Sequence, residues 1–137
     1  MEGRRTSGPP PRAGSLAGRV IVLLEDDELI RRATERMLTR FGATVVSGAR
    51  GADVLAEISE RKLTPSCVIA DYWLGRQENG LAAAAAIRQA CSGPVLGLII
   101  TGDLSQAISD EVAQAGFRLL RKPVNVDSFL DAIIAGE

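Results

Sequence analysis

The sequence has 137 residues, of which 46% are hydrophobic and 24% are charged, the size and balance of one soluble domain with a substantial core. Its 16 basic and 17 acidic residues give a net charge of -1, so no overall charge attracts the chain to nucleic acid or to an anionic membrane. The absence of histidine excludes a Ser-His or Cys-His nucleophile and a His-ligated zinc site within this chain.

The ends and cysteines of the chain indicate a cytoplasmic domain that follows a tail. Residues 1–18 are rich in Pro, Gly and Ser and predict a flexible tail or linker, so we expect the folded domain to span residues 19–137. Cys67 and Cys91 are too few for a disulfide framework and are interpreted as reduced, buried thiols. No apolar run approaches the roughly 18 residues that a membrane-spanning helix needs, and no secretory signal is expected.

The first half of the domain alternates two strands with two helices. Val20–Leu24 is a continuously apolar run, typical of a strand buried on both faces. Apolar residues from Leu29 to Phe41 recur at helical spacing, with Asp27 as the expected N-cap. Thr44–Val46 predicts the second strand. The second helix is marked by Val54, Leu55 and Ile58.

The middle of the chain repeats this alternation. Cys67–Ala70 predicts a third buried strand that ends at Asp71, and Gly75–Gly80 is expected to be a loop. Leu81–Ala90 contains five consecutive alanines, which are strong helix formers. Val95–Ile100 is predicted to be the fourth strand.

The last part of the chain holds one more strand between two helices. Asp103, with Gln106 three residues later, has the spacing of an N-cap and its partner and predicts the start of the fourth helix. Gly116 is expected to end it. Phe117–Leu120 predicts the fifth strand, and an apolar stripe from Val126 to Ile134 predicts the last helix.

Five predicted strands in alternation with five predicted helices indicate an α/β fold with a parallel sheet covered on both faces. Right-handed crossover connections leave few topologies for such a chain. We predict a doubly wound (βα)5, flavodoxin-like sheet with strand order 2-1-3-4-5. In that fold, ligands bind outside the carboxyl ends of the strands.

Polar side chains follow four of the predicted strands: Glu25 and Asp26, then Asp71, Thr101 and Lys122. Taken singly, Thr101 reads as a strand-end hydroxyl, Lys122 as a surface lysine and Asp71 as a loop acid. Their joint occurrence at one sheet edge favours a site. Clustered carboxylates repel one another, and Mg²⁺, which prefers oxygen ligands, relieves that repulsion. A carboxylate beside Mg²⁺ can attack phosphorus, and a lysine and a hydroxyl can neutralise the phosphoryl oxygens.

At these residues the sequence resembles a receiver domain of two-component signalling, over about residues 19–135. The acidic pair of that family matches Glu25 and Asp26, its phosphoacceptor matches Asp71, and its hydroxyl residue and Lys-Pro match Thr101 and Lys122-Pro123. The resemblance implies Mg²⁺ as the cofactor, held by Glu25, Asp26, Asp71 and the backbone carbonyl of Trp73. It also implies a cis Lys122–Pro123 bond.

The resemblance further implies a switch rather than a turnover enzyme. Asp71 would take a phosphoryl group from a phosphohistidine on a histidine kinase or a histidine phosphotransfer protein and later lose it to water. Because the chain has no histidine, that donor must lie outside these residues. The motifs around Asp71, Thr101 and Lys122 are similar to receivers at the C-terminal end of hybrid sensor kinases. A homodimer through the fourth helix, the fifth strand and the fifth helix is a further expectation.

The sequence departs from the family pattern at three places, and other functions stay open. Leu119 stands where many receivers carry an aromatic switch residue, the loop after Asp71 lacks the usual proline and is slightly long, and Trp73 is bulky. One alternative is a degenerate receiver that docks partners without phosphorylation. Another is a phosphatase of the haloacid-dehalogenase type, which needs an aspartate at the position of Trp73. A flavin-binding relative is disfavoured because the acidic residues after the first strand would repel the flavin phosphate.

Overall fold

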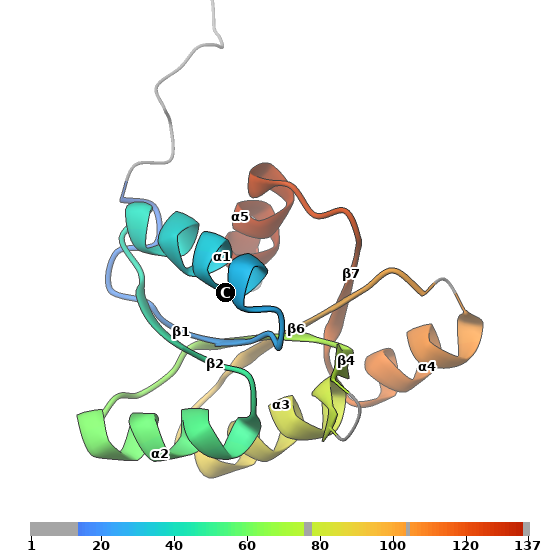
Figure 1. The fold of residues 1–137 in the computed structure, drawn as a ribbon, viewed down its shortest axis with the longest axis horizontal. Helices are drawn as coiled ribbons and strands as arrows, with labels where there is room; N and C mark the ends of the chain where they lie inside the picture. Colours follow the sequence, from blue (N-terminus) through green and yellow to red (C-terminus); the bar gives the residue numbers. More distant parts are fainter. Residues whose placement is uncertain (1–13, 76–77, 104, 136–137) are drawn as a thin grey trace, which may run out of the picture.

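A computed structural model describes residues 14–75, 78–103 and 105–135. It has one five-stranded parallel sheet in the order β2-β1-β3-β6-β7, which confirms the predicted 2-1-3-4-5 topology (Figure 1). The sheet strands are β1 (Val20–Leu24), β2 (Thr44–Gly48), β3 (Cys67–Asp71), β6 (Leu96–Thr101) and β7 (Arg118–Arg121). The helices are α1 (Glu28–Arg40), α2 (Gly51–Arg61), α3 (Gly80–Ala90), α4 (Gln106–Gln114) and α5 (Val126–Ala135).

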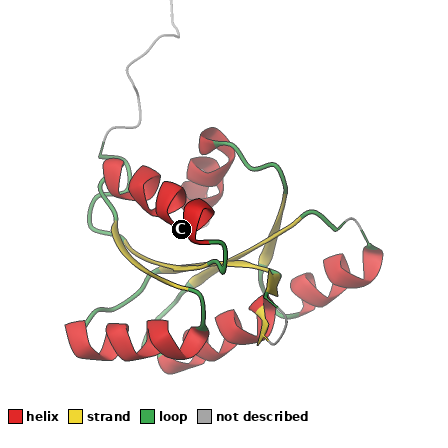
Figure 2. Ribbon diagram, viewed as in Figure 1, coloured by secondary structure: helices red, strands yellow, loops and turns green. Residues whose placement is uncertain are grey.

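The helices cover both faces of the sheet, so the apolar strands are buried between two layers. Helices α1 and α5 lie on one face, and α2, α3 and α4 lie on the other (Figure 2). All five residues of β3 are buried, as expected for the central strand of a parallel sheet. The core therefore consists of two apolar clusters, one on each side of the sheet.

The first helix begins as the sequence predicts. The side chain of Asp27 accepts hydrogen bonds from the backbone N–H groups of Leu29 and Ile30, at 3.0 and 3.1 Å. This N-cap satisfies two N–H groups that otherwise lack a partner at a helix start. Asp27 therefore has a structural role, separate from the acidic pair that precedes it.

The start of the fourth helix differs from the prediction. Ser105, and not Asp103, is the N-cap of α4: its hydroxyl accepts from the N–H of Ile108 at 3.3 Å. The Asp103 carboxylate instead accepts from the N–H of Ser105 at 2.8 Å. The N–H of Asp103 donates to the hydroxyl of Thr101 at 3.0 Å, so Asp103 is joined to the end of β6 and not to the helix start.

The segment expected to be a loop after the third strand contains a small antiparallel ribbon. Its strands are β4 (Trp73–Leu74) and β5 (Glu78–Asn79). Helix α3 then starts at Gly80, and the Asn79 side chain caps it by accepting from the N–H of Ala82 at 3.0 Å. A side chain at Gly80 would collide with the backbone carbonyl of Asp71, so the ribbon and α3 pack directly on the residue that ends β3.

The part of the expected tail that the structure describes is packed against the domain. Leu16 is fully buried, and its N–H donates to the carbonyl of Phe41 at 2.9 Å. The prediction of a tail through Gly18 is therefore too long at its C-terminal end, because one leucine among polar and small residues gave no periodic signal. Residues 1–13 of the expected tail lie outside the described residues.

The two cysteines differ in their burial. Cys67 is buried, and burial raises the pKa of its thiol to about 12, whereas Cys91 is only half-buried rather than buried as expected.

Among the described residues, no helix has the length and apolar character to cross a membrane.

Candidate functional site

The register of the sheet brings the predicted polar residues to one edge. Leu24 of β1 pairs with Ala70 of β3, so Glu25 and Asp71 follow at the same level. Asp71 in turn pairs with Ile100, the residue before Thr101. Because parallel strands end at the same edge, the acids, the hydroxyl and the lysine that follow these strands lie close together, as the sequence predicts.

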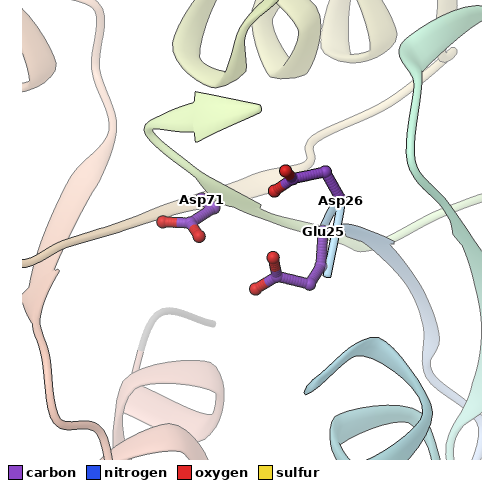
Figure 3. Close-up of side chains that lie close together, drawn as sticks. All are labelled: Glu25, Asp26 and Asp71. Atoms are coloured by element: carbon purple, nitrogen blue, oxygen red, sulfur yellow. The ribbon is translucent and has the colours of Figure 1, made fainter. Parts of the chain in front are cut away.

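Three carboxylates form the centre of this site. Glu25, Asp26 and Asp71 each offer an oxygen within 4.8 Å of the others. Figure 3 shows the three carboxyl groups around one small space, two from the end of β1 and one from the end of β3. Glu25 and Asp71 are 7% and 9% exposed, whereas Asp26 is exposed, so the cluster opens to solvent on the side of Asp26.

Burial makes the charged form of Glu25 unfavourable. It raises the pKa of this carboxyl from 4.5 to about 7, against a hydrogen bond of 3.1 Å that its Oε2 accepts from the N–H of Asp27. The negative charges of Asp71 and Asp26 add to the upward shift, and the ammonium of Lys122 opposes it. A positive charge added near Glu25 would therefore stabilise its carboxylate form.

Lys122 is the cation that pairs with Asp71. Its Nζ donates to Asp71 Oδ2 at 2.9 Å. Partial burial lowers the pKa of Lys122, but the hydrogen bond to Asp71 and the charges of the three carboxylates outweigh this effect, so its pKa is raised. The lysine is therefore protonated and within reach of any group attached to Asp71. The Lys122–Pro123 peptide is cis, as the resemblance implied.

Thr101 completes the group. Its side chain is buried, and its Oγ1 accepts from the N–H of Asp103 at 3.0 Å. A hydroxyl that accepts one hydrogen bond still has its own proton to donate. Gly102 follows directly, and a Cβ placed there would have Lys122 Cβ as its nearest neighbour outside the adjacent residues, at 4.0 Å.

The residues present fit a magnesium ion. Mg²⁺ binds oxygen ligands at about 2.0–2.1 Å in an octahedron, whose ligand oxygens lie about 3–4 Å apart. The carboxylate oxygens of Glu25, Asp26 and Asp71 are within 4.8 Å of one another, so small side-chain rotations bring them to that spacing. Burial first, and then the charges of Asp71 and Asp26, raise the pKa of Glu25, and a divalent cation at this place would favour its charged form.

Several contacts near the site are not predicted by the sequence pattern. Arg31 donates to the carbonyl of Glu25 at 2.9 Å, Tyr72 donates its hydroxyl to Glu111 at 2.6 Å, and Glu78 accepts from the N–H of Gly51 at 3.2 Å. The last two join residues far apart in the chain, so no local pattern could have revealed them.

A groove of about 430 Å³ opens beside the carboxylates. Its polar lining includes Glu25, Asp71 and Lys122, and its walls come mainly from apolar residues of β1, α1, β6 and α5. Leu119 stands at the position of the aromatic switch residue. It is half-buried and packs against the apolar cluster on the face of the sheet that α2, α3 and α4 cover.

The comparison with protein families matches most of the chain. The sequence model of the family described as "Response regulator receiver domain" matches residues 21–134. That range contains all six residues of the predicted site. No curated protein matches the chain.

Solved structures of similar fold include receiver proteins from several bacteria. Chemotaxis protein CheY4 of Vibrio cholerae has 23% identity, with a TM-score of 0.76 over 88% of this chain and 100% of that one. A receiver domain protein of Clostridium thermocellum has 20% identity and a TM-score of 0.74, over 86% and 93%. A response regulator of Burkholderia pseudomallei has 24% identity and a TM-score of 0.73, over 84% and 66%, and its structure contains a phosphorylated aspartic acid and a calcium ion. At these identities the likeness shows a shared fold.

Proposed function

The chain belongs to the response regulator receiver family, and from that premise we propose that it is a Mg²⁺-dependent phosphoacceptor in which Asp71 receives a phosphoryl group from a partner phosphohistidine. The observation that carries this proposal is the arrangement around Asp71. One of its carboxylate oxygens is paired with Lys122, and its carboxyl group lies within a cluster of three acids. Such an arrangement holds a nucleophilic carboxylate between a metal site and a fixed cation.

The proposed reaction moves one phosphoryl group to Asp71 from a phosphohistidine that lies outside these residues. A carboxylate oxygen of Asp71 attacks phosphorus, the O–P bond forms as the N–P bond of the phosphohistidine breaks, and the imidazole leaves with the bonding electron pair and takes up a proton. Lys122 holds one oxygen of the transferring group, and the Thr101 hydroxyl donates to another. Hydrolysis of the acyl phosphate by water then restores Asp71.

The acidic pair has the complementary role of holding the cofactor. Glu25 and Asp26, with Asp71 and the Trp73 carbonyl, would bind Mg²⁺, which neutralises the charge that gathers on the phosphoryl oxygens during transfer. The Burkholderia pseudomallei response regulator, with its phosphorylated aspartic acid and calcium ion, supports the pairing of a divalent cation with an acyl phosphate in this fold.

We also propose a setting for the domain. The motif similarities favour a cytoplasmic receiver at the C-terminal end of a hybrid sensor kinase, with a histidine kinase or histidine phosphotransfer protein as its donor. Homodimerisation would use α4, β7 and α5. The reading frame around this chain tests the first point, and sedimentation of the phosphorylated and unphosphorylated protein tests the second.

Mass spectrometry with a small phosphodonor tests the reaction directly. We expect the intact protein, incubated with acetyl phosphate and Mg²⁺, to gain one phosphoryl group, and we expect chelation of Mg²⁺ to prevent this. Asp71→Asn should abolish the gain, whereas Asp103→Asn, which changes an exposed acid near the site, should keep it. Labelling that persists in Asp71→Asn would contradict the proposal. The absence of any labelling would favour a degenerate docking domain, and steady release of phosphate from a phosphomonoester would favour a phosphatase.

A further inference from the structure

The ribbon between β3 and α3 has a feature that bears on the metal site, on the premise of the proposed function. By its resemblance to receiver domains, this segment is expected to be slightly long, and it lacks a proline. The structure fills it with the paired strands β4 and β5, in which Trp73 is opposite Asn79 and Leu74 is opposite Glu78. The segment that carries Trp73 is therefore held by pairing rather than by a proline turn.

The register of this ribbon leaves the Trp73 carbonyl without a partner inside it. Opposed residues of an antiparallel pair alternate between those that exchange hydrogen bonds and those that do not. The N–H of Gly80 donates to the carbonyl of Tyr72, its opposite residue, at 2.7 Å, so the next pair, Trp73 and Asn79, is of the kind without hydrogen bonds. Among the described residues of the ribbon, the carbonyl of Trp73 therefore has no backbone partner and can face a ligand.

A side-chain hydrogen bond also joins the ribbon to the start of helix α2. Helix α2 has Arg50 as its N-cap residue, which makes no side-chain capping bond. Glu78 of β5 supplies the missing acceptor: its Oε1 accepts from the N–H of Gly51 at 3.2 Å. A Cβ at Gly51 would lie 3.2 Å from the same carboxylate, so glycine permits this close approach.

The ribbon meets the acidic cluster at its turn. A Cβ built on Gly75, directly after β4, would lie 3.7 Å from Asp26 Oδ2. Asp26 and Glu78 also line a common groove of about 530 Å³, between the ribbon and the start of α2. A shift of the ribbon relative to α2 would therefore move the Trp73 backbone relative to the carboxylates of the metal site.

We propose that Glu78 is a positioning residue for the Mg²⁺ site. It acts through its hydrogen bond to Gly51, which holds the ribbon on α2 and so fixes the backbone of Trp73 relative to the carboxylates of the metal site. It does not itself bind the metal. Residues that orient ligands in this way commonly affect metal affinity strongly when they are changed.

Two substitutions of Glu78 separate this role from a simple effect of its charge. Glu78→Gln removes the negative charge and keeps an oxygen acceptor at the same reach. Glu78→Asp keeps the charge and shortens the side chain by one methylene, so it withdraws the acceptor from a hydrogen bond that already measures 3.2 Å. Positioning predicts that Gln preserves the site and Asp impairs it, whereas charge attraction predicts the reverse.

Calorimetric titration of the full chain with Mg²⁺ measures the effect. We expect Glu78→Asp and Glu78→Ala to raise the Mg²⁺ dissociation constant roughly tenfold, the lower end of what loss of an orienting contact costs, and Glu78→Gln to stay within about twofold of the unchanged protein. Glu60→Ala, which removes an exposed glutamate from the other end of α2, serves as the control and should have no effect. Urea unfolding without Mg²⁺ checks that each variant is folded.

The outcomes distinguish this inference from the proposed function. If the unchanged protein does not bind Mg²⁺, the proposed function fails. If it binds Mg²⁺ and Glu78→Asp binds equally well, or if Glu78→Gln loses as much affinity as Glu78→Ala, the positioning role of Glu78 is wrong while the phosphoacceptor proposal stands.

Discussion

Glu25→Gln should stabilise the protein in the absence of metal, because it removes a negative charge that burial makes unfavourable in the folded state. The carboxyl is 7% exposed, and burial raises its pKa from 4.5 to about 7. At about 1.36 kcal/mol for each pH unit, that difference sets a ceiling of about 3 kcal/mol. Water that enters the adjoining groove screens part of the charge, so we expect a gain of about 1–2 kcal/mol in the free energy of unfolding at pH 8.

The sign of this effect depends on pH in a defined window. The pKa of Glu25 is higher in the folded state than its ordinary value of 4.5, so folding favours the protonated carboxyl. Below about pH 4.5 the group is protonated in both states and costs nothing, whereas above about pH 7 the folded state carries the full cost of the charge. The advantage of the Gln variant should therefore grow from near zero at pH 4 to its full value at pH 8.

Urea unfolding in the presence of a chelator, at pH 4, 6 and 8, measures this advantage. Gln keeps an acceptor for the N–H of Asp27, which now donates to Glu25 Oε2, so the cap geometry is preserved. Glu60→Gln changes an exposed glutamate and should shift stability by less than about 0.5 kcal/mol. Addition of Mg²⁺ should stabilise the unchanged protein more than the Gln variant. A Gln variant that is less stable at pH 8, or whose advantage does not change with pH, would refute the reasoning.

Three other substitutions test the surroundings of Asp71. Trp73→Asn should shorten the half-life of the phosphorylated state roughly three- to tenfold if the indole hinders water from reaching the acyl phosphate, and an unchanged half-life in a dephosphorylation time course would dismiss this role. Gly80→Ala should cost about 2–4 kcal/mol in urea unfolding, because its Cβ would collide with the Asp71 carbonyl; a neutral result would mean that α3 can move away freely. Tyr72→Phe should cost about 1 kcal/mol by loss of the 2.6 Å hydrogen bond to Glu111, whereas Glu111→Gln, which keeps an acceptor, should cost less, and equal losses would contradict that account.

The topology and the main site could be predicted because both depend on local patterns. A continuous apolar run such as Val20–Leu24 is readable as a buried strand, and an acid that directly follows it can be placed at the sheet edge. The same logic placed Asp71, Thr101 and Lys122, whose relative positions follow from the order of the strands. The structure has Lys122 paired with Asp71 at 2.9 Å, in agreement with that placement.

The remaining features depend on contacts that no local pattern encodes. The ribbon of β4 and β5 pairs two residues with two, which is too short for a strand signal, and Glu78 caps a helix that begins 27 residues earlier. Leu16 is buried by a contact with the far end of α1. Asp103 satisfied the spacing of an N-cap, but the hydroxyl of Thr101 accepts from its N–H and Ser105 caps the helix.

The identity of the phosphorylated residue is the most direct test of the phosphoacceptor function. Borohydride reduces an aspartyl phosphate to homoserine, and trypsin should release residues 63–76 as one peptide, in which Asp71 is the single carboxylate side chain. After incubation with Mg²⁺ and a phosphodonor, we predict homoserine at position 71 of this peptide and unmodified aspartate in the rest of the chain. Homoserine at Asp26 or at any other acid, with residue 71 unmodified, would contradict the assignment of Asp71 as the phosphoacceptor.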